Sequence, residues 1–445
     1  MTPATDVLSS EKKQTTAGNY FVANYPPFSF WKRENRHKVE EVLDRKSNLD
    51  TPLGLYLHLP FCRKRCHFCY FRVYTGREAK RDRVAAYIEA VLNELKAYAR
   101  KPLLAGRLPQ YIYFGGGTPS FLSPEQLEQL IHGMKSVLPW DRAEEVTFEC
   151  EPGTLDERKL DVLRELGVTR LSLGVENFSD HVLKSNGRAH LSKEIYRSYD
   201  YARSIGFHQI NIDLIAGMLN ETEENWHSCV AKTAALAPDC VTVYQMEIPF
   251  NTAIYQQMHE RGDIVAPVAD WPTKRAWVAE AFEKLEDSGY TVADAYSAVR
   301  NPDEYRFRYR EYLWTGADMI SLGVSSFGHF RGVHYQNEKD FGPYIDRVAG
   351  GELPIHRALE MTEEEKLVRE VILQLKFGSL DRAYFQEKFG ADIYDRFSRQ
   401  LGRLRDDGHL AIDGDRVTLR RAGLLAIDEL LHDFFLPQHQ SARYT

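Results

Sequence analysis

Short apolar runs alternate with longer stretches of helical periodicity through the middle of the chain. Strand-length apolar runs occur at six places, which are residues 53–59, 111–114, 146–150, 170–175, 209–215 and 241–246. Between the first two runs, the apolar side chains of residues 84–98 recur every three or four positions, as on one face of a helix. Strands that alternate with helices form a parallel sheet in which the helices make the crossovers. The pattern therefore predicts an α/β fold built on a partial (β/α)6 barrel of the TIM type.

The start of the chain does not follow this alternation. Residues 1–18 are polar and are expected to be disordered. Residues 19–31 are rich in aromatic side chains but cannot form a regular helix, because Pro26 and Pro27 lack backbone donors and restrict the backbone. This segment could form an arm over a cleft or an N-terminal wrap, and the pattern favours the wrap. Residues 32–50 predict a helix and a linker.

The pattern changes again after residue 360. Three helical stretches are followed by a hairpin at 410–419, with Asp413 and Gly414 at its turn, and by a last helix. This order predicts a mainly helical, winged-helix-like domain. Acidic residues crowd the wing, which favours a lid or scaffold beside a substrate cleft over a DNA-binding role. The expected parts are an N-terminal arm and linker at 1–49, the barrel at 50–300, an extension that closes the cleft at 301–358 and the C-terminal domain at 359–445.

Composition narrows the class of protein. The 445 residues carry a net charge of −7 without long blocks of one sign, which gives no electrostatic reason to expect nucleic acid as a partner. There is no run of 18 apolar residues and the polar N-terminus lacks a secretory core, so we expect no membrane span and a cytoplasmic protein. The six cysteines, three clustered and three scattered, do not have the pattern of a disulfide framework.

The clustered cysteines follow the first predicted strand. Cys62, Cys66 and Cys69 have three and then two residues between them, and we expect them on a loop at the C-terminal end of that strand. Three thiols neither complete a four-thiolate zinc site nor pair fully into disulfides. A [4Fe–4S] cluster held by three cysteines leaves one iron free for another ligand. The alternative is a zinc knuckle that His58 or His67 completes.

A glycine triplet follows the second predicted strand, at the same edge of the sheet. Gly115, Gly116 and Gly117 precede Thr118, and the lack of side chains would let a ligand approach the backbone closely and use its amide donors. In barrels of parallel strands the chemistry lies at the C-terminal ends of the strands. A glycine triplet alone is otherwise only a turn.

The cysteine pattern, Cys-x3-Cys-x-Phe-Cys, resembles the signature of radical S-adenosylmethionine (radical SAM) enzymes. The resemblance implies a [4Fe–4S] cluster on these three cysteines, with the amino and carboxylate groups of SAM on the free iron. It also implies reductive cleavage of SAM to a 5'-deoxyadenosyl radical, which abstracts hydrogen from a substrate. This chemistry needs an electron donor, such as a flavodoxin or ferredoxin.

Further segments resemble one branch of that superfamily, the oxygen-independent coproporphyrinogen III dehydrogenases (HemN) with their relatives, the haem chaperone HemW and the class C radical SAM methyltransferases. The segments are YFGGGTP, FECEPGT, LSLGVENF, NGR and NIDLIAGM. The resemblance implies that SAM is bound by Tyr56, Gly115, Gly116, Gly117, Thr118, Glu149, Glu176, Arg188 and Asp213. The candidate catalytic residues are Glu149, Arg188 and Tyr309.

Several positions depart from the HemN pattern. Phe71 stands where the dehydrogenases have a further cysteine, and Glu176 replaces a glutamine. The residues that hold a second SAM in the dehydrogenase correspond to Tyr309 and Phe327, which are of other types. A second SAM therefore remains an open alternative.

The stretch 304–314 alternates arginine with aromatic residues. On a strand, Arg306, Arg308 and Arg310 would share one face and could clamp the carboxylates of a substrate. A solvated strand face is the more ordinary interpretation.

The expected activity is decarboxylation of a porphyrinogen, as in the coproporphyrinogen III dehydrogenases. The alternative is a class C methyltransferase that acts on another flat aromatic molecule, such as a quinone or heterocycle, and a haem chaperone is a third possibility. A monomer is expected in each case.

Overall fold

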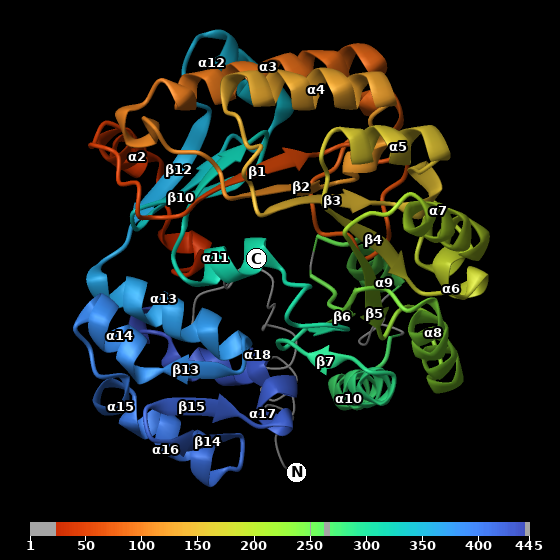
Figure 1. The fold of residues 1–445 in the computed structure, drawn as a ribbon, viewed down its shortest axis with the longest axis vertical. Helices are drawn as coiled ribbons and strands as arrows, with labels where there is room; N and C mark the ends of the chain where they lie inside the picture. The colour runs from red at the N-terminus through yellow and green to blue at the C-terminus, as the bar shows by residue number, and fades with distance from the viewer. Residues whose placement is uncertain (1–23, 250, 262–267, 441–445) are drawn as a thin grey trace.

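A long mixed sheet forms the centre of the protein (Figure 1). The structure is a computed structural model that describes residues 24–249, 251–261 and 268–440, so the predicted disorder of residues 1–18 lies outside the described residues. All six predicted strands are present, each with its ends within two residues of the prediction. They are β1 (Leu53–Leu59), β2 (Tyr111–Gly116), β3 (Glu145–Cys150), β4 (Arg170–Glu176), β5 (Gln209–Ala216) and β6 (Cys240–Gln245). They are parallel and adjacent in chain order, which confirms the predicted α/β architecture.

Helices cover the outer face of these strands (Figure 1). They are α3 (Arg81–Ala99), α4 (Pro124–Val137), α5 (Glu157–Glu165), α6 (Asp180–Ser185), α7 (Ser192–Ser204), α8 (Glu223–Leu236) and α10 (Trp271–Asp287). α9 (Ala253–Arg261) lies instead at the cysteine loop, where the Ile254 amide donates to the carbonyl of His67. α3 buries Val84, Ile88, Val91 and Leu95, the stripe that its periodicity predicts. The side chains of Ser123 and Gln126 form the capping box of α4. The inner face is left to the cavity described below.

The sheet extends beyond the six strands in both directions. β9 (Asp318–Leu322) pairs in parallel with β1, and β10 (Phe327–Phe330), β11 (Val333–Asn337) and β12 (Ile355–Glu360) continue the sheet in antiparallel pairing. At the opposite edge, β8 (Ser297–Val299) pairs antiparallel with β6, followed by β7 (Thr291–Val292). The result is a twelve-stranded sheet. An extension was expected at 301–358, but its strands β9 to β12 were not predicted from the sequence.

A buried ion pair fastens this extension to the barrel. Arg107 Nη1 donates to Asp318 Oδ2 at 2.8 Å, and the two side chains are 2% and 1% exposed. Arg107 Nη2 also donates to the carbonyl of Thr51 at 2.9 Å, and the amide of Arg331 donates to Asp318 Oδ1 at 2.7 Å. The pair therefore joins the chain just before β1 to the first residue of β9.

The N-terminal segment packs against the extension. Trp31 stacks on His334 of β11 with ring centroids 5.1 Å apart, and Lys32 makes backbone hydrogen bonds with Ala358 of β12. α2 (Arg36–Leu43) follows, in the region where a helix was predicted. The described part of the segment therefore forms a wrap, while Asn24 also reaches the cavity.

The C-terminal part forms a second layer on the open side of the barrel (Figure 1). Its elements are α13 (Glu363–Lys376), β13 (Ser379–Asp381), α14 (Arg382–Phe389), α15 (Ile393–Arg396), α16 (Ser398–Asp406), β14 (Leu410–Asp413), β15 (Arg416–Leu419), α17 (Arg421–Leu425) and α18 (Ile427–Leu430). The predicted hairpin is present as β14 and β15, with β13 as a third strand. α12 (Phe341–Ala349) joins β11 to β12 within the extension and packs beside α3 (Figure 1). Among the described helices, none combines the length and apolar character needed to cross a membrane.

The prediction of a strand at 304–314 is wrong. The structure has a helix there, α11 (Arg308–Trp314), which lies under β1 and β2 (Figure 1). Its buried residues are Arg310, Leu313 and Trp314. These positions have the i, i+3, i+4 spacing of a helix, which outweighs the period of two in the residues before them.

Candidate active site

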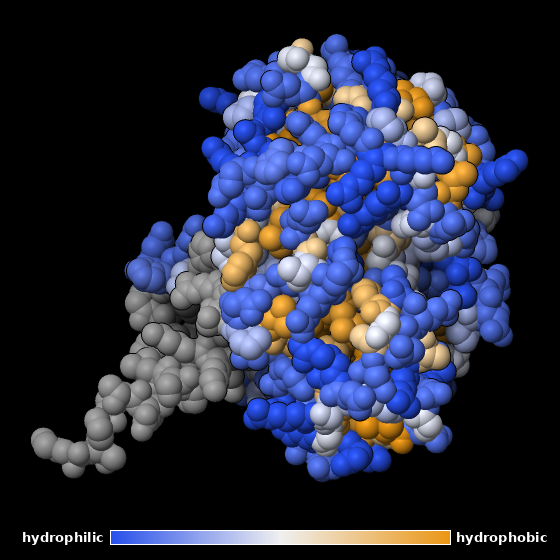
Figure 2. Space-filling view, turned by 90° about the vertical axis from the view of Figure 1, so that its left-hand side faces the viewer, coloured by the Kyte–Doolittle hydropathy of each residue, from blue (hydrophilic) through white to orange (hydrophobic). Residues whose placement is uncertain are grey.

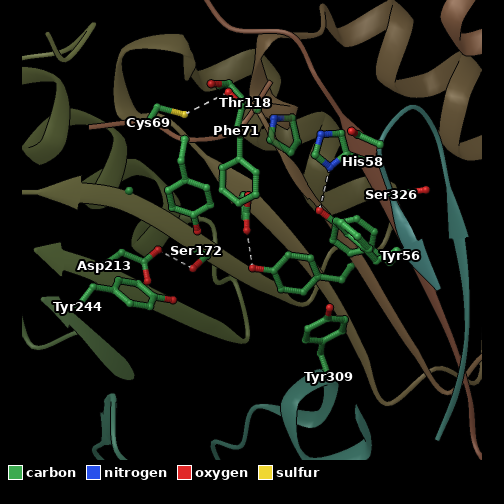
Figure 3. A pocket seen from close by; sticks show the side chains of 18 of the residues that line it. Tyr56, His58, Cys69, Phe71, Thr118, Ser172, Asp213, Tyr244, Tyr309 and Ser326 are labelled. Atoms are coloured by element: carbon green, nitrogen blue, oxygen red, sulfur yellow. Dashed lines mark hydrogen bonds between the residues drawn. The ribbon is translucent and has the colours of Figure 1, made fainter. Parts of the chain in front are cut away.

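A cavity of about 700 Å³ runs along the inner face of the barrel. Its walls come from β1 to β6, from the loop after β1, from α11 and from β10 and β11. Nine of the predicted site residues line it: Tyr56, Cys69, Gly117, Thr118, Glu149, Glu176, Arg188, Asp213 and Tyr309. Figure 3 labels five of them, Tyr56, Cys69, Thr118, Asp213 and Tyr309, whose side chains surround one space. The remaining four, Cys62, Cys66, Gly115 and Gly116, are not part of the lining.

Two hydrogen bonds reach the sulfur atoms of the cysteine loop. Thr118 donates to Cys62 Sγ at 3.2 Å, and Arg188 Nη1 donates to Cys66 Sγ at 3.2 Å. Burial raises the pKa of Cys62 to about 12 and that of Cys69 to about 11. These thiols therefore ionise at neutral pH only when a metal supplies positive charge, and the two donors are placed to stabilise the resulting thiolates.

The spacing of the three thiols fits a cluster better than a single ion. Among the described residues, the sulfur atoms of Cys62, Cys66 and Cys69 do not all lie within 4.8 Å of one another. A tetrahedral zinc ion, with zinc–sulfur bonds of about 2.3 Å, would hold its thiolates about 3.8 Å apart. His67 Nδ1 lies 3.0 Å from the carbonyl of Ser185, and His58 Nδ1 lies 3.2 Å from the Tyr56 hydroxyl. These contacts occupy one ring nitrogen of each histidine, and among the described residues neither histidine belongs to a group of three ligand atoms within 4.8 Å of one another, so the zinc-knuckle alternative has no preformed site.

The glycine triplet mainly allows the cysteine loop to pack closely. A Cβ on Gly117 would lie 2.8 Å from the carbonyl oxygen of Leu59, and one on Gly116, whose φ is +110°, would lie 2.7 Å from the His58 ring. The Gly117 amide donates to Leu59 O at 2.8 Å, and the Gly116 amide donates to Glu149 Oε2 at 3.2 Å. These two amides already have protein acceptors, so the expectation that they are free for a ligand is not met.

Three buried carboxyl groups line one wall of the cavity. Tyr113 donates to Glu149 at 2.6 Å, and Ser172 donates to Asp213 at 2.9 Å. Burial raises the pKa of Glu149 and of Glu176 to about 7, and it raises the pKa of Asp213 as well. Such an acidic wall suits the hydroxyl and ammonium groups of a nucleoside ligand.

A bulge in β4 directs Glu176 toward this wall. The register between β4 and β5 shifts between Gly174 and Glu176, and Glu176 has a φ of +64°. A positive φ is strained for a glutamate and is retained where the surrounding structure requires it. Arg188 lies 3.6 Å from Glu176 and donates to the carbonyl of Gly174 at 2.5 Å. The bulge and Arg188 together hold the carboxyl group at the cavity.

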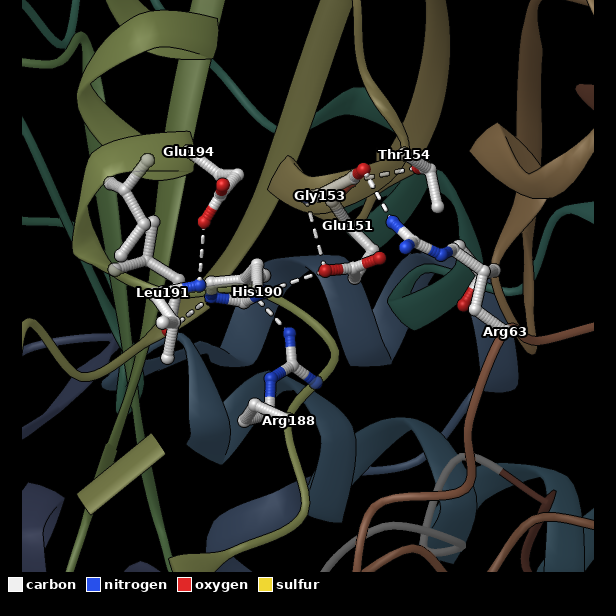
Figure 4. Close-up of polar contacts among 12 residues, drawn as sticks. Arg63, Glu151, Gly153, Thr154, Arg188, His190, Leu191 and Glu194 are labelled. Carbon is white, nitrogen blue, oxygen red and sulfur yellow. Dashed lines mark hydrogen bonds and ion pairs between the residues drawn. The ribbon is translucent and has the colours of Figure 1, made fainter. Parts of the chain in front are cut away.

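The sequence analysis missed a polar network behind Arg188 (Figure 4). His190 Nδ1 and Glu151 Oε1 lie 2.7 Å apart, and both side chains are almost fully buried. The Gly153 amide donates to the same carboxyl oxygen at 3.1 Å, and Arg63 of the cysteine loop donates to the carbonyl of Gly153 at 2.6 Å. The network ties the loop after β3 to the cysteine loop and to the segment that carries Arg188. No sequence pattern marks it, because its members come from three separate loops.

Aromatic residues form a second wall, which adjoins the acidic one at Tyr113. The Tyr309 ring lies 4.4 Å from that of Tyr113 and 5.8 Å from that of Phe307, measured between centroids. Phe327 lines the same side. Phe71 is 38% exposed and its ring points into the cavity (Figure 3). A flat apolar molecule would fit between these rings and the acidic wall.

The proposed arginine clamp does not form. Arg306 and Arg308 pair with Glu311 at the surface, at 2.7 and 3.0 Å. Arg310 is buried and pairs with Asp294 at 2.5 Å. Because α11 is a helix, the three guanidinium groups point in different directions and each already has a carboxylate partner.

Replacement of Glu149 by Gln is expected to stabilise the protein at pH 8 more than at pH 5. An unfolded glutamate ionises near pH 4.5, whereas burial raises the pKa of Glu149 to about 7. The wild-type protein therefore loses stability as the pH rises through this window, by up to about 1.4 kcal/mol per pH unit. Glutamine does not titrate and still accepts the Tyr113 hydrogen bond. Melting temperatures of both proteins check this; a constant difference between pH 5 and pH 8 would contradict it.

Comparison with known proteins shows which kind of enzyme the chain is. The profile of the Radical SAM superfamily matches residues 56–231, and that of the HemN C-terminal domain matches residues 361–426. The crystal structure of Escherichia coli coproporphyrinogen III oxidase (HemN), a radical SAM enzyme, superposes with a TM-score of 0.80 at 26% identity and covers 96% of this chain and 98% of that one. The chain is a radical SAM enzyme. It belongs to the HemN/HemW-like branch, as its motifs predicted.

Curated relatives named coproporphyrinogen III oxidase and a relative named HemW have similar sequence identity to this chain. The oxygen-independent coproporphyrinogen III oxidase of E. coli is 28% identical over 410 residues, with 88% of each chain covered. The enzyme of that name from Pseudomonas aeruginosa is 27% identical over 413 residues, also with 88% covered. The haem chaperone HemW of Bacillus subtilis is 28% identical over 384 residues, which cover 85% of this chain and 98% of HemW. Membership of the superfamily implies a [4Fe–4S] cluster and SAM as cofactors, and the spacing of the thiols and the acidic wall fit both.

Proposed function

We propose that this radical SAM enzyme oxidatively decarboxylates a porphyrinogen, as its relatives named coproporphyrinogen III oxidase do. The observation that carries the proposal is the continuity of the cavity. One space connects Cys69 and the acidic wall to the aromatic wall around Tyr309. When bound, the cluster and SAM would supply a 5'-deoxyadenosyl radical at the boundary between the two walls.

The proposed roles of the site residues follow from their positions. The cysteines Cys62, Cys66 and Cys69 would hold the cluster. The acidic wall, with Arg188 and the loop at Gly117 and Thr118, would bind SAM; the proposed set is Tyr56, Gly115, Gly116, Gly117, Thr118, Glu149, Glu176, Arg188 and Asp213. Tyr309 would contact the substrate, because it lies on the aromatic wall with its ring against Tyr113.

The proposed reaction removes one hydrogen atom and one carboxylate from a propionate arm. The hydrogen atom is transferred from the arm to the nucleoside, the carboxylate leaves as CO2, and one electron passes to an acceptor as the vinyl group forms. A separate protein of the flavodoxin or ferredoxin class would reduce the cluster. We place this chemistry in the cytoplasm and in a monomer.

One observation keeps a methyltransferase as the second candidate. Phe71 lines the cavity two residues after Cys69, and its side chain is an apolar ring without a thiol. A class C methyltransferase that uses a second SAM on a flat aromatic acceptor would need the aromatic wall but no propionate chemistry. A haem chaperone would need the cavity without turnover.

An anaerobic assay separates the three functions. Reconstituted protein is given reductant, SAM and coproporphyrinogen III, and 5'-deoxyadenosine, S-adenosylhomocysteine and the mass of the porphyrinogen are followed together. We expect 5'-deoxyadenosine and loss of CO2 from the porphyrinogen, without S-adenosylhomocysteine. S-adenosylhomocysteine with an unchanged porphyrinogen would favour the methyltransferase. Stoichiometric haem binding without 5'-deoxyadenosine would favour the chaperone.

A further inference from the structure

The innermost part of the cavity contains a buried arginine that the sequence analysis did not select. Arg170 is the first residue of β4, is 1% exposed, and lines the cavity. It lies two residues before Ser172 and on the same face of the strand, so it is farther from the C-terminal end of β4 than the acidic wall. Its guanidinium lies over the ring of Phe307, 4.1 Å from the centroid.

Two donors of this guanidinium have no partner. Among the residues the structure describes, no acceptor lies within hydrogen-bonding distance of Arg170 Nε or Nη1, although both atoms are buried. Buried donors of a cationic group that make no hydrogen bond destabilise the folded protein, and a ligand that accepts hydrogen bonds from them would remove this cost.

The carboxylates nearest to Arg170 are satisfied by other donors. Glu145 accepts hydrogen bonds from Thr147 and from the backbone amides of Arg308 and Tyr309. Asp213 accepts from Ser172 and Asn211. These acids balance the charge of Arg170 at a distance and leave its two donors unused.

The other arginines that line the cavity differ in degree. Arg188 has one buried donor without a partner, Nε, but its two other nitrogens donate to Cys66 and Gly174. Arg72 pairs with Asp340 at 2.7 Å, and Arg369 donates to the carbonyl of Leu313. Among the arginines that the structure describes in the cavity lining, Arg170 is the one with two buried donors that have no partner. The ring of Phe307 holds the plane of the guanidinium in place, which suits the recognition of a planar anion by two parallel hydrogen bonds.

We propose that Arg170 anchors a carboxylate of the substrate at the inner end of the cavity. The ligand class is an aromatic or macrocyclic molecule that carries a carboxylate on a short arm, with the rings between Tyr309 and Phe327 and the carboxylate on Arg170. The carboxylate anchor deepens the proposed function, and the choice of a porphyrinogen as the ligand rests on that function. It replaces the arginine cluster of α11 as the source of carboxylate recognition.

The test compares Arg170→Met with the wild-type holoenzyme in binding three probes. The probes are coproporphyrin III, its tetramethyl ester and 3-phenylpropionate, a minimal aromatic carboxylate. We expect Arg170→Met to weaken binding of coproporphyrin III and of 3-phenylpropionate by about 10- to 100-fold, the usual effect of losing a charge-assisted pair. Binding of the ester should be the same in both proteins. Fluorescence quenching measures the porphyrins, and calorimetry measures 3-phenylpropionate.

Thermal stability separates anchoring from a structural role. If Arg170 serves a ligand, Arg170→Met should melt at or above the wild-type temperature, because it removes a buried charge with unused donors. Arg170→Lys is the second variant; it keeps the charge but not the planar pair of donors, so its binding should be intermediate. Arg306→Met is the matched control, because Arg306 is at the surface and outside the cavity lining, and it should bind all probes as the wild type does.

The outcomes for the anchor and for the proposed function are distinct. If coproporphyrin III fails to bind the wild type while 3-phenylpropionate binds in an Arg170-dependent way, the porphyrinogen is wrong and the anchor stands. If no carboxylate probe binds more weakly to folded Arg170→Met or Arg170→Lys, the anchor is wrong whatever the substrate. A large loss of melting temperature in both variants would likewise assign Arg170 to the fold and overturn the proposal.

Discussion

Replacement of Cys66 by Ala should abolish iron in the reconstituted protein. The three cysteines are the thiols of the loop after β1, and the described part of the structure offers no other cysteine in the cavity lining except Cys150. Cys150 is fully buried on β3 and its Sγ faces the carbonyl of Phe148, so it is not placed to substitute. Without Cys66 a second iron of the cluster has no protein ligand, and the Arg188 guanidinium loses the sulfur to which it donates.

Iron and sulfide analysis, the visible absorption spectrum and 5'-deoxyadenosine formation measure the effect. Cys229→Ala is the matched control, because Cys229 is buried in α8 and lies outside the cavity. This variant should retain iron at the wild-type level. Wild-type iron in Cys66→Ala would disprove the assignment of the cluster site.

The second large effect concerns stability. Replacement of Arg107 by Met should lower the free energy of unfolding by about 3–5 kcal/mol, because it leaves the buried carboxylate of Asp318 without its partner. It also removes the hydrogen bond to Thr51 that holds the start of β1. Chemical denaturation measures the change.

The double variant Arg107→Met/Asp318→Asn shows whether the uncompensated charge is the cause. The neutral side chain of Asn at position 318 still accepts the hydrogen bond from the backbone amide of Arg331, and neither member of the pair is charged any longer. Most of the lost stability should therefore return. If the double variant were as unstable as the sum of the two single variants, packing and not charge would explain the loss.

The six barrel strands could be predicted because they are buried on both faces. Strands of this kind appear in a sequence as continuous apolar runs, and β1 was predicted with its observed bounds, Leu53–Leu59. The strands of the extension give a weaker signal. β11 contains His334 and Gln336 at buried positions, where they are stabilised by hydrogen bonds that only the fold supplies.

The site residues that could be predicted are those marked by their spacing in the sequence or by resemblance to a family. The spacing of Cys62, Cys66 and Cys69 indicates a metal site without any structure. Arg170 and His190 could not be found in this way. A charged residue at the start of a strand is ordinarily exposed, and only the packing of Phe307 against it shows that Arg170 is buried inside the barrel.

The prediction that the C-terminal hairpin forms a lid depends on where the hairpin lies relative to the cavity. The hairpin of β14 and β15 was expected beside the substrate cleft. Among the described residues of the C-terminal part, Arg369 of α13 lines the cavity and the hairpin does not. The face of the molecule shown in Figure 2 is mostly hydrophilic, with apolar side chains in scattered groups. The C-terminal part is therefore better described as a scaffold for α13.

The wall formed by the N-terminal wrap has a consequence for the synthesis of the protein. Tyr25 accepts a hydrogen bond on its carbonyl from His334, and its hydroxyl meets the Leu436 amide and His439, which are 411 and 414 residues away. Contacts of this separation cannot form until the ribosome has made nearly the whole chain. The cysteine loop, in contrast, is complete within the first sixth of the chain. During translation the thiols are thus present long before the N-terminal wrap is fixed in place, so they have to stay reduced until the cluster is assembled.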